Sequence, residues 1–234
     1  MATGNHKQNI HISYDIPTRI YHRKVTDLVN KYSSKDASVL DIGAGAGNML
    51  ALLHQQRPDL QLHAADAYQC ALDVISTKLP IEEEWLLSEG QLNLSNIDLR
   101  FDTIVMSHVL EHVWNPVDAV LQALACLNEG GRLVLAVPNA VTPANIIKHI
   151  LRRYPVNEGH CFLWDRGHWI NFLENIVQAD VLEYAHDEMF LFKRKTASTS
   201  ILKKIEISLA DLFPALSFSH IAVIQKPVSR SRDE

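Results

Sequence analysis

A cluster of small residues, Gly-Ala-Gly-Ala-Gly at positions 43–47, has the residue types and spacing to hold a ligand. Small residues between a strand and a helix let a ligand approach the backbone closely, and the start of the following helix offers free N–H groups. Asp41 precedes the cluster, and Asp66 follows at a position where a carboxylate can accept both hydroxyl protons of a ribose. The pattern predicts a site for a ribose-containing ligand. It does not by itself identify that ligand, because the same turn also serves NAD and FAD.

Histidines and one acid form a second group with the chemistry of proton transfer. His108, Glu111 and His112 fall within five residues, and His160 and His168 come later in the chain. Imidazole is the usual proton acceptor near neutral pH. Other roles stay open here, because Glu111 and His112 could hold a loop to a helix and His160 could be a packing residue.

Alternating strands and helices must position these residues. Apolar runs predict strands, and apolar residues at helical spacing predict helices. Asn128–Gly131 has the composition of a helix stop followed by a turn. The alternation predicts an α/β fold with a Rossmann-like, doubly wound, mostly parallel sheet of seven strands and helices on both faces. The expected strands are 37–42, 60–65, 85–87, 101–107, 132–137, 189–193 and 218–224, and the expected helices are 17–32, 48–56, 67–78, 116–127, 143–153 and 202–212.

We expect one domain, with four parts along its length. Residues 1–37 form an N-terminal helical segment and 38–139 the ligand-binding core. Residues 140–188 form a variable segment that covers the substrate, with Phe162 and Trp164 among its aromatic residues, and 189–226 supply the closing strands. Tyr14 and Tyr21 could close the ligand site from the N-terminal segment, or pack a helix on the sheet.

Composition limits the function classes. The chain has 234 residues, 47% of them apolar, and a formal net charge of -5. This acidic balance disfavours a nucleic-acid coat protein. The three cysteines, Cys70, Cys126 and Cys161, are too few and too scattered for a disulfide framework. No apolar stretch is long enough to span a membrane, and the first residues lack an apolar signal core, so we expect a cytoplasmic protein. The oligomeric state stays open, with a homodimer as one option.

Four segments together resemble the class I S-adenosylmethionine-dependent methyltransferases, in that family's order and spacing. They are VLDIGAGAG (39–47), LHAAD (62–66), FDTIVMSHVLEHV (101–113) and GGRLVLAVPN (130–139). The resemblance implies S-adenosylmethionine as cofactor and S-adenosylhomocysteine as product. It implies that Asp41 orients the turn and the amino group, that Asp66 binds the ribose, and that Ser107 and His108 line the space by the sulfonium. The implied cofactor-binding set is Asp41, Gly43, Ala44, Gly45, Asp66, Ala67, Glu89, Gly90, Ser107 and His108, with the adenine near Glu89 and Gly90.

A hydroxyl on a small molecule is the methyl acceptor that we expect. His108 or His160 would take its proton, with His112 and Glu111 in support, and we expect no metal. HVLEH together with GHCFLWDR also resembles the metal-binding signature of the small-RNA 3′-terminal 2′-O-methyltransferases, which have Glu where this chain has His108. That RNA reaction, a non-catalytic binding module and a dinucleotide oxidoreductase are the alternatives.

Overall fold

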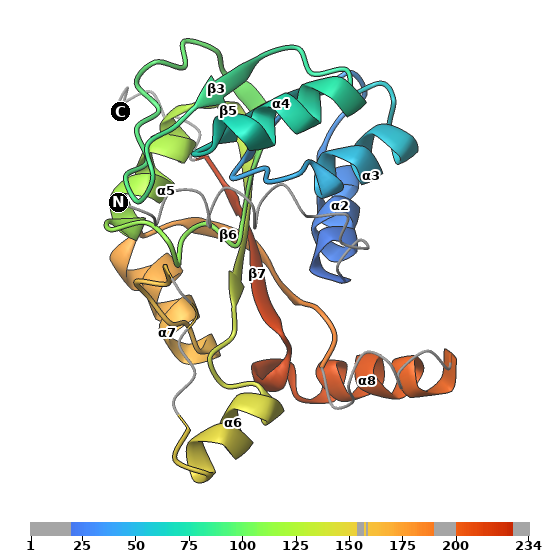
Figure 1. The fold of residues 1–234 in the computed structure, drawn as a ribbon, viewed down its shortest axis with the longest axis vertical. Helices are drawn as coiled ribbons and strands as arrows, with labels where there is room; N and C mark the ends of the chain where they lie inside the picture. Colours follow the sequence, from blue (N-terminus) through green and yellow to red (C-terminus); the bar gives the residue numbers. More distant parts are fainter. Residues whose placement is uncertain (1–19, 154–156, 158, 190–199, 227–234) are drawn as a thin grey trace, which may run out of the picture.

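The computed structural model describes residues 20–153, 157, 159–189 and 200–226, and builds them around a seven-stranded sheet (Figure 1). The strand order is β3-β2-β1-β4-β5-β7-β6. β7 runs antiparallel to β5 and β6, and the other neighbouring strands are parallel. The expected doubly wound, mostly parallel sheet is confirmed. The strands are β1 (Ser38–Ile42), β2 (Gln61–Asp66), β3 (Glu84–Leu86), β4 (Phe101–Ser107), β5 (Leu127–Pro138), β6 (Asp180–His186) and β7 (Ser219–Gln225).

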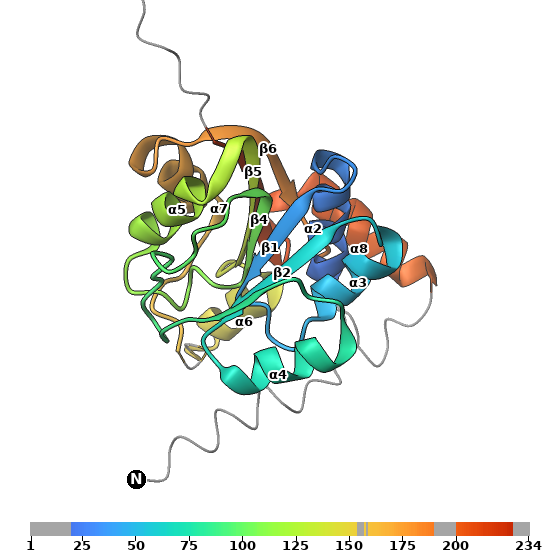
Figure 2. The same ribbon diagram turned by 90° about the horizontal axis from the view of Figure 1, so that it is seen from above.

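Helices cover both faces of the sheet, which gives three layers. Seen from above, α5 and α7 lie on one side, and α2, α3 and α8 lie on the other (Figure 2). The helices are α2 (Ile20–Tyr32), α3 (Asn48–Gln56), α4 (Gln69–Lys78), α5 (Pro116–Ala125), α6 (Pro143–Ile150), α7 (Arg166–Asn171) and α8 (Ser200–Leu212), with a π-helical turn at Phe172–Ile176 and a 3-10 turn at Pro214–Leu216.

The central strands supply a core on each face because successive side chains point to opposite sides of a sheet. Leu40 and Ile42 of β1 pack into one apolar cluster together with Trp169 and Phe172. Val39 of the same strand packs into the second cluster, with side chains of α2, α3 and α4. Burial on both faces explains why these strands are continuous apolar runs in the sequence.

Side-chain caps fix where three helices after β4 begin. Asn115 accepts the backbone N–H of Asp118 at the start of α5, and Thr142 accepts that of Asn145 at the start of α6. Asp165 accepts the N–H of His168 at the start of α7. These bonds satisfy backbone donors that a helix leaves free in its first turn.

Two expectations about strands need correction. Asn128–Gly131 is not a loop between a helix and a strand, because β5 already begins at Leu127 and the pairing with β4 jumps from Leu127 to Arg132 across an irregularity. The strand expected at 189–193 is not confirmed. The strand that pairs with β7 at this edge is β6, which lies earlier in the chain and ends at His186. Met189 lies outside any strand, and 190–193 lie outside the described residues.

α6 stands apart from the layers, at the lower end of the molecule in Figure 1. None of its residues is buried, and Ile147 and Ile150 are exposed. It ends at Ile150, three residues before the expected end at 153. Across the described part of the chain, we find no helix with the length and apolar character needed to traverse a lipid bilayer.

Candidate active site

A pocket of about 290 Å³ opens where β1, β2 and β4 end. Open α/β sheets bind ligands in the crevice outside the carboxyl ends of their strands, at the point where the strand order reverses. Here that point lies between β1 and β4, which are neighbours in the sheet. The lining residues are Ile42, Gly43, Gly45, Asp66, Ala67, Tyr68, Leu87, Ser88, Glu89, Gly90, Leu92, His108, Val109, His112, Val113 and Gly159.

The glycine turn forms one wall of the pocket. Gly43 and Gly45 both have positive φ angles, which other residues rarely adopt. A methyl group on Gly43 would overlap the side chain of Val109, whereas one on Gly45 would meet no protein atom within 4 Å. Glycine is therefore needed at position 43 because a larger side chain would overlap Val109. At position 45, the space that a side chain would fill is open to the pocket.

Asp66 lies at the end of β2 and faces this turn. Its Oδ2 accepts the backbone N–H of Gly45 at 2.8 Å, and its Oδ1 accepts that of Tyr68 at 3.0 Å. Each carboxylate oxygen has a second lone pair, so Asp66 can hold the turn and still accept hydrogen bonds from a ligand.

Asp41 occupies a different environment. It is buried within β1 and is not among the residues that line the pocket. Burial raises the pKa of Asp41 well above its usual range, and the nearby charge of Asp66 raises it further. Asp41 lies two residues before the turn, and both of its expected roles, orienting the turn and contacting an amino group, stay predictions.

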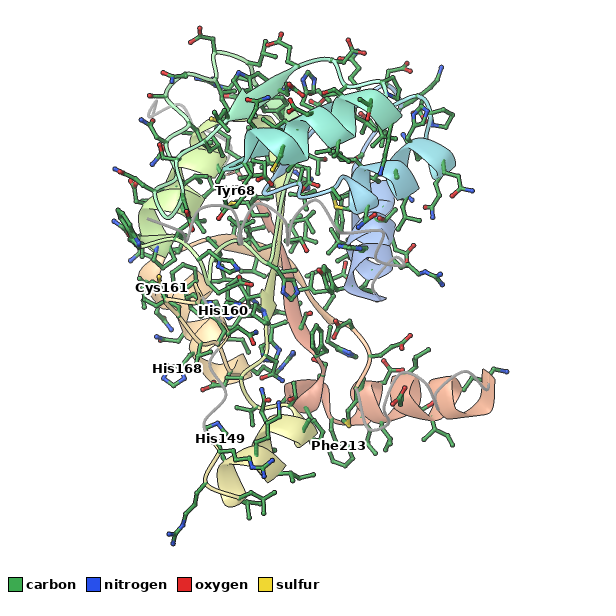
Figure 3. All side chains as sticks on the ribbon, viewed as in Figure 1. Tyr68, His149, His160, Cys161, His168 and Phe213 are labelled. Atoms are coloured by element: carbon green, nitrogen blue, oxygen red, sulfur yellow. The ribbon has the colours of Figure 1, made fainter. Side chains whose placement is uncertain are left out.

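Tyr68 and Glu89 form a polar pair on the pocket wall that the sequence did not reveal. Burial and a hydrogen bond to Glu89 raise the pKa of the Tyr68 hydroxyl to about 12. Tyr68 follows Asp66 by two residues and projects near the middle of the molecule in Figure 3. The pair places a hydrogen-bonding group beside Gly90, in the region expected to bind the adenine.

His108 begins the opposite wall, directly after β4. Its φ angle is +60°, a left-handed conformation that costs a residue other than glycine about 1–3 kcal/mol. Its Nε2 lies 3.1 Å from the Ser219 hydroxyl, and its ring stacks on that of Tyr21 with centroids 4.2 Å apart. These contacts hold the imidazole in place, with Nδ1 3.5 Å from the carboxylate of Glu111.

Glu111, His112 and His160 gather beside His108, and His112 also lines the pocket. One ligand atom from each lies within 4.8 Å of the others, which is close enough for the three side chains to hold a metal ion. Burial lowers the pKa of His160, and nearby His112 and His108 lower it further while Glu111 opposes them. Figure 3 shows His160 next to Cys161, on the side of the molecule that also carries His168.

The sequence-based site residues thus fall into two groups. Gly43, Gly45, Asp66, Ala67, Glu89, Gly90, His108 and His112 line the pocket. Asp41, Ala44, Ser107, Glu111 and His160 do not line it but lie on the segments that form it. Tyr21 stacks on His108 but is not among the residues that line the pocket, and Tyr14 lies outside the described residues. His168 is separate, exposed and paired with Asp165 at 2.6 Å.

The sequence matches the family described as "Methyltransferase domain" over residues 18–176, which is more than half of the chain. The chain belongs to this family. It is an S-adenosylmethionine-dependent methyltransferase, and the oxidoreductase and non-catalytic interpretations are set aside.

Two solved structures share the fold of this methyltransferase. The plantazolicin methyltransferase BpumL in complex with S-adenosylhomocysteine aligns with a TM-score of 0.61 and 19% identity, over 97% of this chain and 92% of the other. The N-methyltransferase NodS from Bradyrhizobium japonicum, also with S-adenosylhomocysteine, aligns with a TM-score of 0.60 and 17% identity, over 95% and 97%.

A curated relative is the mitochondrial ubiquinone biosynthesis O-methyltransferase of Schizosaccharomyces pombe. It is 26% identical over 153 residues, which are 61% of this chain and 52% of the relative. The methyltransferase therefore spans about half the length of this relative.

The pocket fits the cofactor. Gly45 leaves room for a close approach to the backbone, and Asp66 keeps free lone pairs at the end of β2 for ribose hydroxyls. Glu89 and Tyr68 supply polar groups farther along the wall.

Proposed function

We propose that this methyltransferase transfers the methyl group to a hydroxyl oxygen of a small molecule. The observation that carries the proposal is the position of His108, on the pocket wall with a ring nitrogen 3.5 Å from a buried carboxylate. A hydroxyl is a poor nucleophile until it loses its proton, and a positioned imidazole can accept that proton. The curated relative is named as an O-methyltransferase, which supports the same acceptor atom.

Each group has a defined part in the reaction. S-adenosylmethionine, when bound, supplies an electrophilic methyl group and keeps the electron pair of the broken carbon–sulfur bond on sulfur. Asp66 and the turn at Gly45 bind the cofactor. His108 accepts the proton of the acceptor hydroxyl at Nε2, the ring nitrogen that does not face Glu111, in place of its hydrogen bond with Ser219. The carboxylate of Glu111 stabilises the imidazolium that results. Holding acceptor and methyl carbon in line supplies most of the remaining rate enhancement.

His108 is favoured over His160 as the proton acceptor. His108 lines the pocket, whereas near His160 the lining residues are His112 and Gly159. The left-handed conformation of His108 also supports a functional role, because strained residues that persist cluster at active sites.

A panel of matched acceptors tests the reaction. Phenols and alcohols would be compared with the corresponding amines, and S-adenosylhomocysteine formation would be measured with mass spectrometry of the product. We expect methylated oxygen, lost in His108→Asn and retained in His168→Asn. Methylation of amines alone, or equal rates for His108→Asn and the parent, would overturn the proposal.

RNA is the second candidate acceptor, because a 2′-hydroxyl is also an alcohol. The observation that favours it is the exposed basic group at the end of α6, made of Lys148, Arg152 and Arg153, which could contact phosphates. Short single-stranded RNA and the same strand with a 3′-terminal 2′-deoxy nucleotide decide between the two acceptors. Transfer that requires the terminal 2′-hydroxyl and weakens with salt would favour RNA.

A further inference from the structure

Asp187 is a buried carboxyl close to the histidine proposed as the proton acceptor. It follows β6 directly, and only 5% of the residue is exposed. Its Oδ1 accepts the backbone N–H of Ser219 at 2.7 Å, while its Oδ2 has no hydrogen-bond partner among the residues that the structure describes. A buried polar atom without a partner destabilises a fold. Asp187 is therefore a candidate for a part in the reaction.

Ser219 joins this carboxyl to His108. Ser219 is the first residue of β7 and is fully buried. Its hydroxyl lies 3.1 Å from Nε2 of His108, and the same hydroxyl acts on Asp187 as a hydrogen-bond donor. A serine hydroxyl can donate one hydrogen bond and accept another at the same time. The three side chains therefore form a short hydrogen-bonded chain from the pocket wall into the interior.

Nε2 is the nitrogen of His108 whose proton changes during the reaction. The other nitrogen, Nδ1, faces the carboxylate of Glu111 at 3.5 Å. A proton left on Nε2 would be held by the Ser219 hydroxyl, and the imidazole could not accept another. The ring also stacks on Tyr21, and only 16% of its side chain is exposed, which restricts the loss of this proton directly to water. His108 thus needs a neighbour that removes the proton after each turnover.

The environment of Asp187 suits a group that gains and loses a proton near neutral pH. Burial raises the pKa of Asp187 to about 7, and the N–H and hydroxyl of Ser219 and the charge of His108 oppose this rise. A carboxyl with its ordinary pKa of about 4 would stay ionised beside an imidazole, which ordinarily titrates near about 6.5. The raised pKa of Asp187 lets a carboxyl and an imidazole exchange one proton with only a small difference in free energy.

We propose that Asp187 takes up the proton of His108 through the hydroxyl of Ser219, and so restores His108 as a proton acceptor. Once the methylated product has left, the hydrogen bond between Nε2 and Ser219 forms again. The N–H bond at Nε2 breaks as an O–H bond forms on Ser219, and the original hydroxyl proton of Ser219 passes to the carboxylate of Asp187.

This transfer neutralises an imidazolium and a carboxylate together, and no atom is oxidised or reduced. Asp187 then releases the proton to solvent before the next turnover. Asp187 is a positioning residue in this scheme, because it acts through Ser219 and touches neither cofactor nor acceptor. The inference rests on the proposed function, since it supplies the step that follows each proton transfer to His108.

Infrared spectroscopy detects the proton on Asp187 without any assay of activity. A protonated carboxyl has a C=O band distinct from the bands of a carboxylate. We expect such a band in the full-length parent protein at about pH 6, below the pKa of Asp187, and its absence in Asp187→Asn. Asp180→Asn, at an exposed position of β6, should keep the band. Identical spectra for the parent and Asp187→Asn in this region would reject the proposal.

The same band reports the coupling to His108. The charge of His108 is one of the groups that oppose the effect of burial on the pKa of Asp187. In His108→Asn that charge is gone, so the band should persist to a higher pH than in the parent. A band with the same pH dependence in both proteins would show that the two residues do not share a proton.

Steady-state kinetics test the path through the hydroxyl. We expect kcat to fall at least about tenfold in Asp187→Asn, while the affinity for S-adenosylhomocysteine stays close to that of the parent. Ser219→Ala keeps the backbone N–H that donates to Asp187 but lacks the hydroxyl, so its kcat should fall to a similar extent. Asp180→Asn should keep the kcat of the parent. A parent-like kcat in Ser219→Ala would show that the proton does not pass through this hydroxyl.

A double-mutant cycle separates this role from a merely structural one. Residues that act as one unit lose activity non-additively, so Asp187→Asn should cause no further fall of kcat in the His108→Asn background. Equal fold-losses in both backgrounds would contradict the proposal. Asp187→Asn keeps the size of the side chain and cannot carry a buried charge, so at about pH 7 we expect its Tm at or above that of the parent. A lower Tm together with weaker cofactor binding would assign Asp187 to the fold alone.

Failure of this proton path and failure of the proposed function give different results. If the parent methylates hydroxyl oxygen and Asp187→Asn does so at the same rate, the path is rejected and the function stands. If the parent methylates only nitrogen while the infrared band of Asp187 responds to His108→Asn, the function is rejected and the shared proton stands.

Discussion

The carboxylate of Asp66 accepts the backbone N–H of Gly45 at 2.8 Å, so the acid at the end of β2 also holds the turn after β1. A ribose-binding carboxylate and the turn beneath the ligand are therefore one unit. Loss of this carboxylate would disturb both the direct contacts to the cofactor and the shape of its cradle.

Asp66→Asn keeps the size of the side chain and one acceptor oxygen but removes the charge. We expect S-adenosylhomocysteine to bind about 1–3 kcal/mol more weakly, the range for losing hydrogen bonds to a charged group. Calorimetric titration measures the change. Asp73→Asn, at an exposed position of α4, is the control. An affinity of Asp66→Asn for S-adenosylhomocysteine equal to that of the parent would show that Asp66 does not bind the ribose.

Gly45→Ala and Gly43→Ala should fail in different ways. In Gly45→Ala the new methyl group meets no protein atom, so we expect a loss of only about 1–2 kcal/mol from backbone strain but a severe loss of cofactor binding. In Gly43→Ala the methyl group would overlap Val109, so stability should fall as well. Thermal melts with and without S-adenosylhomocysteine separate the two effects. Normal cofactor binding by Gly45→Ala would show that the ligand does not approach this residue.

His108→Asn tests the proton acceptor with little effect on the backbone, because asparagine tolerates the left-handed conformation better than most residues. We expect kcat to fall by about 10²–10⁴, while the affinity for S-adenosylhomocysteine changes much less. Steady-state kinetics and calorimetry on the same preparation provide both values. A fall in cofactor affinity that accounts for the whole loss of activity would assign His108 to binding instead.

Asp187 and His220 should make stability depend on pH in opposite directions. Burial raises the pKa of Asp187 to about 7, although the N–H and hydroxyl of Ser219 and the charge of His108 lower it. Between its ordinary value of 3.8 and about 7, the folded state keeps a proton that the unfolded state has released. The free energy of unfolding therefore falls as pH rises through this range, by at most about 1.4 kcal/mol per pH unit.

His220 makes the free energy of unfolding depend on pH in the opposite direction. Burial and the charges of Arg166 and His186 lower the pKa of His220 to about 4, against the effect of Asp165. Between 6.5 and about 4 the unfolded state binds a proton that the folded state excludes, so stability falls as pH falls.

Two variants separate these contributions. In urea titrations, Asp187→Asn should gain stability relative to the parent as pH rises from about 4 to 7. His220→Gln should gain relative stability as pH falls below 6.5. Parallel pH profiles for the parent and both variants would contradict these assignments.

Much of the fold could be predicted from the sequence because the central strands are buried on both faces. β1, β2 and β4 are apolar runs whose ends place Asp66 and His108 at one edge of the sheet. β6 was not predicted from the sequence, because it is an edge strand whose side chains alternate irregularly between exposed and buried and form no apolar run. The glycines at 130 and 131 indicate a turn by type, yet they lie within β5 at an irregularity of its pairing with β4.

The candidate site was predictable where ligand contacts come from the backbone of one motif. The turn at 43–47 belongs to this class, and Asp66 was predictable from its place at the end of the next strand. The pairing of Tyr68 with Glu89 and the approach of His160 to Glu111 depend on loop conformations that residue types alone do not specify. The same holds for the burial of Glu111 without a hydrogen-bond partner among the described residues, which only packing reveals.

Calorimetric titration of the full-length protein with S-adenosylhomocysteine tests the central claim most directly. The pocket between the glycine turn and His108 predicts one bound molecule per chain, with binding weakened in both Asp66→Asn and Gly45→Ala. Saturable binding of NADH in place of S-adenosylhomocysteine, or no heat with either ligand at millimolar concentration, would contradict the account.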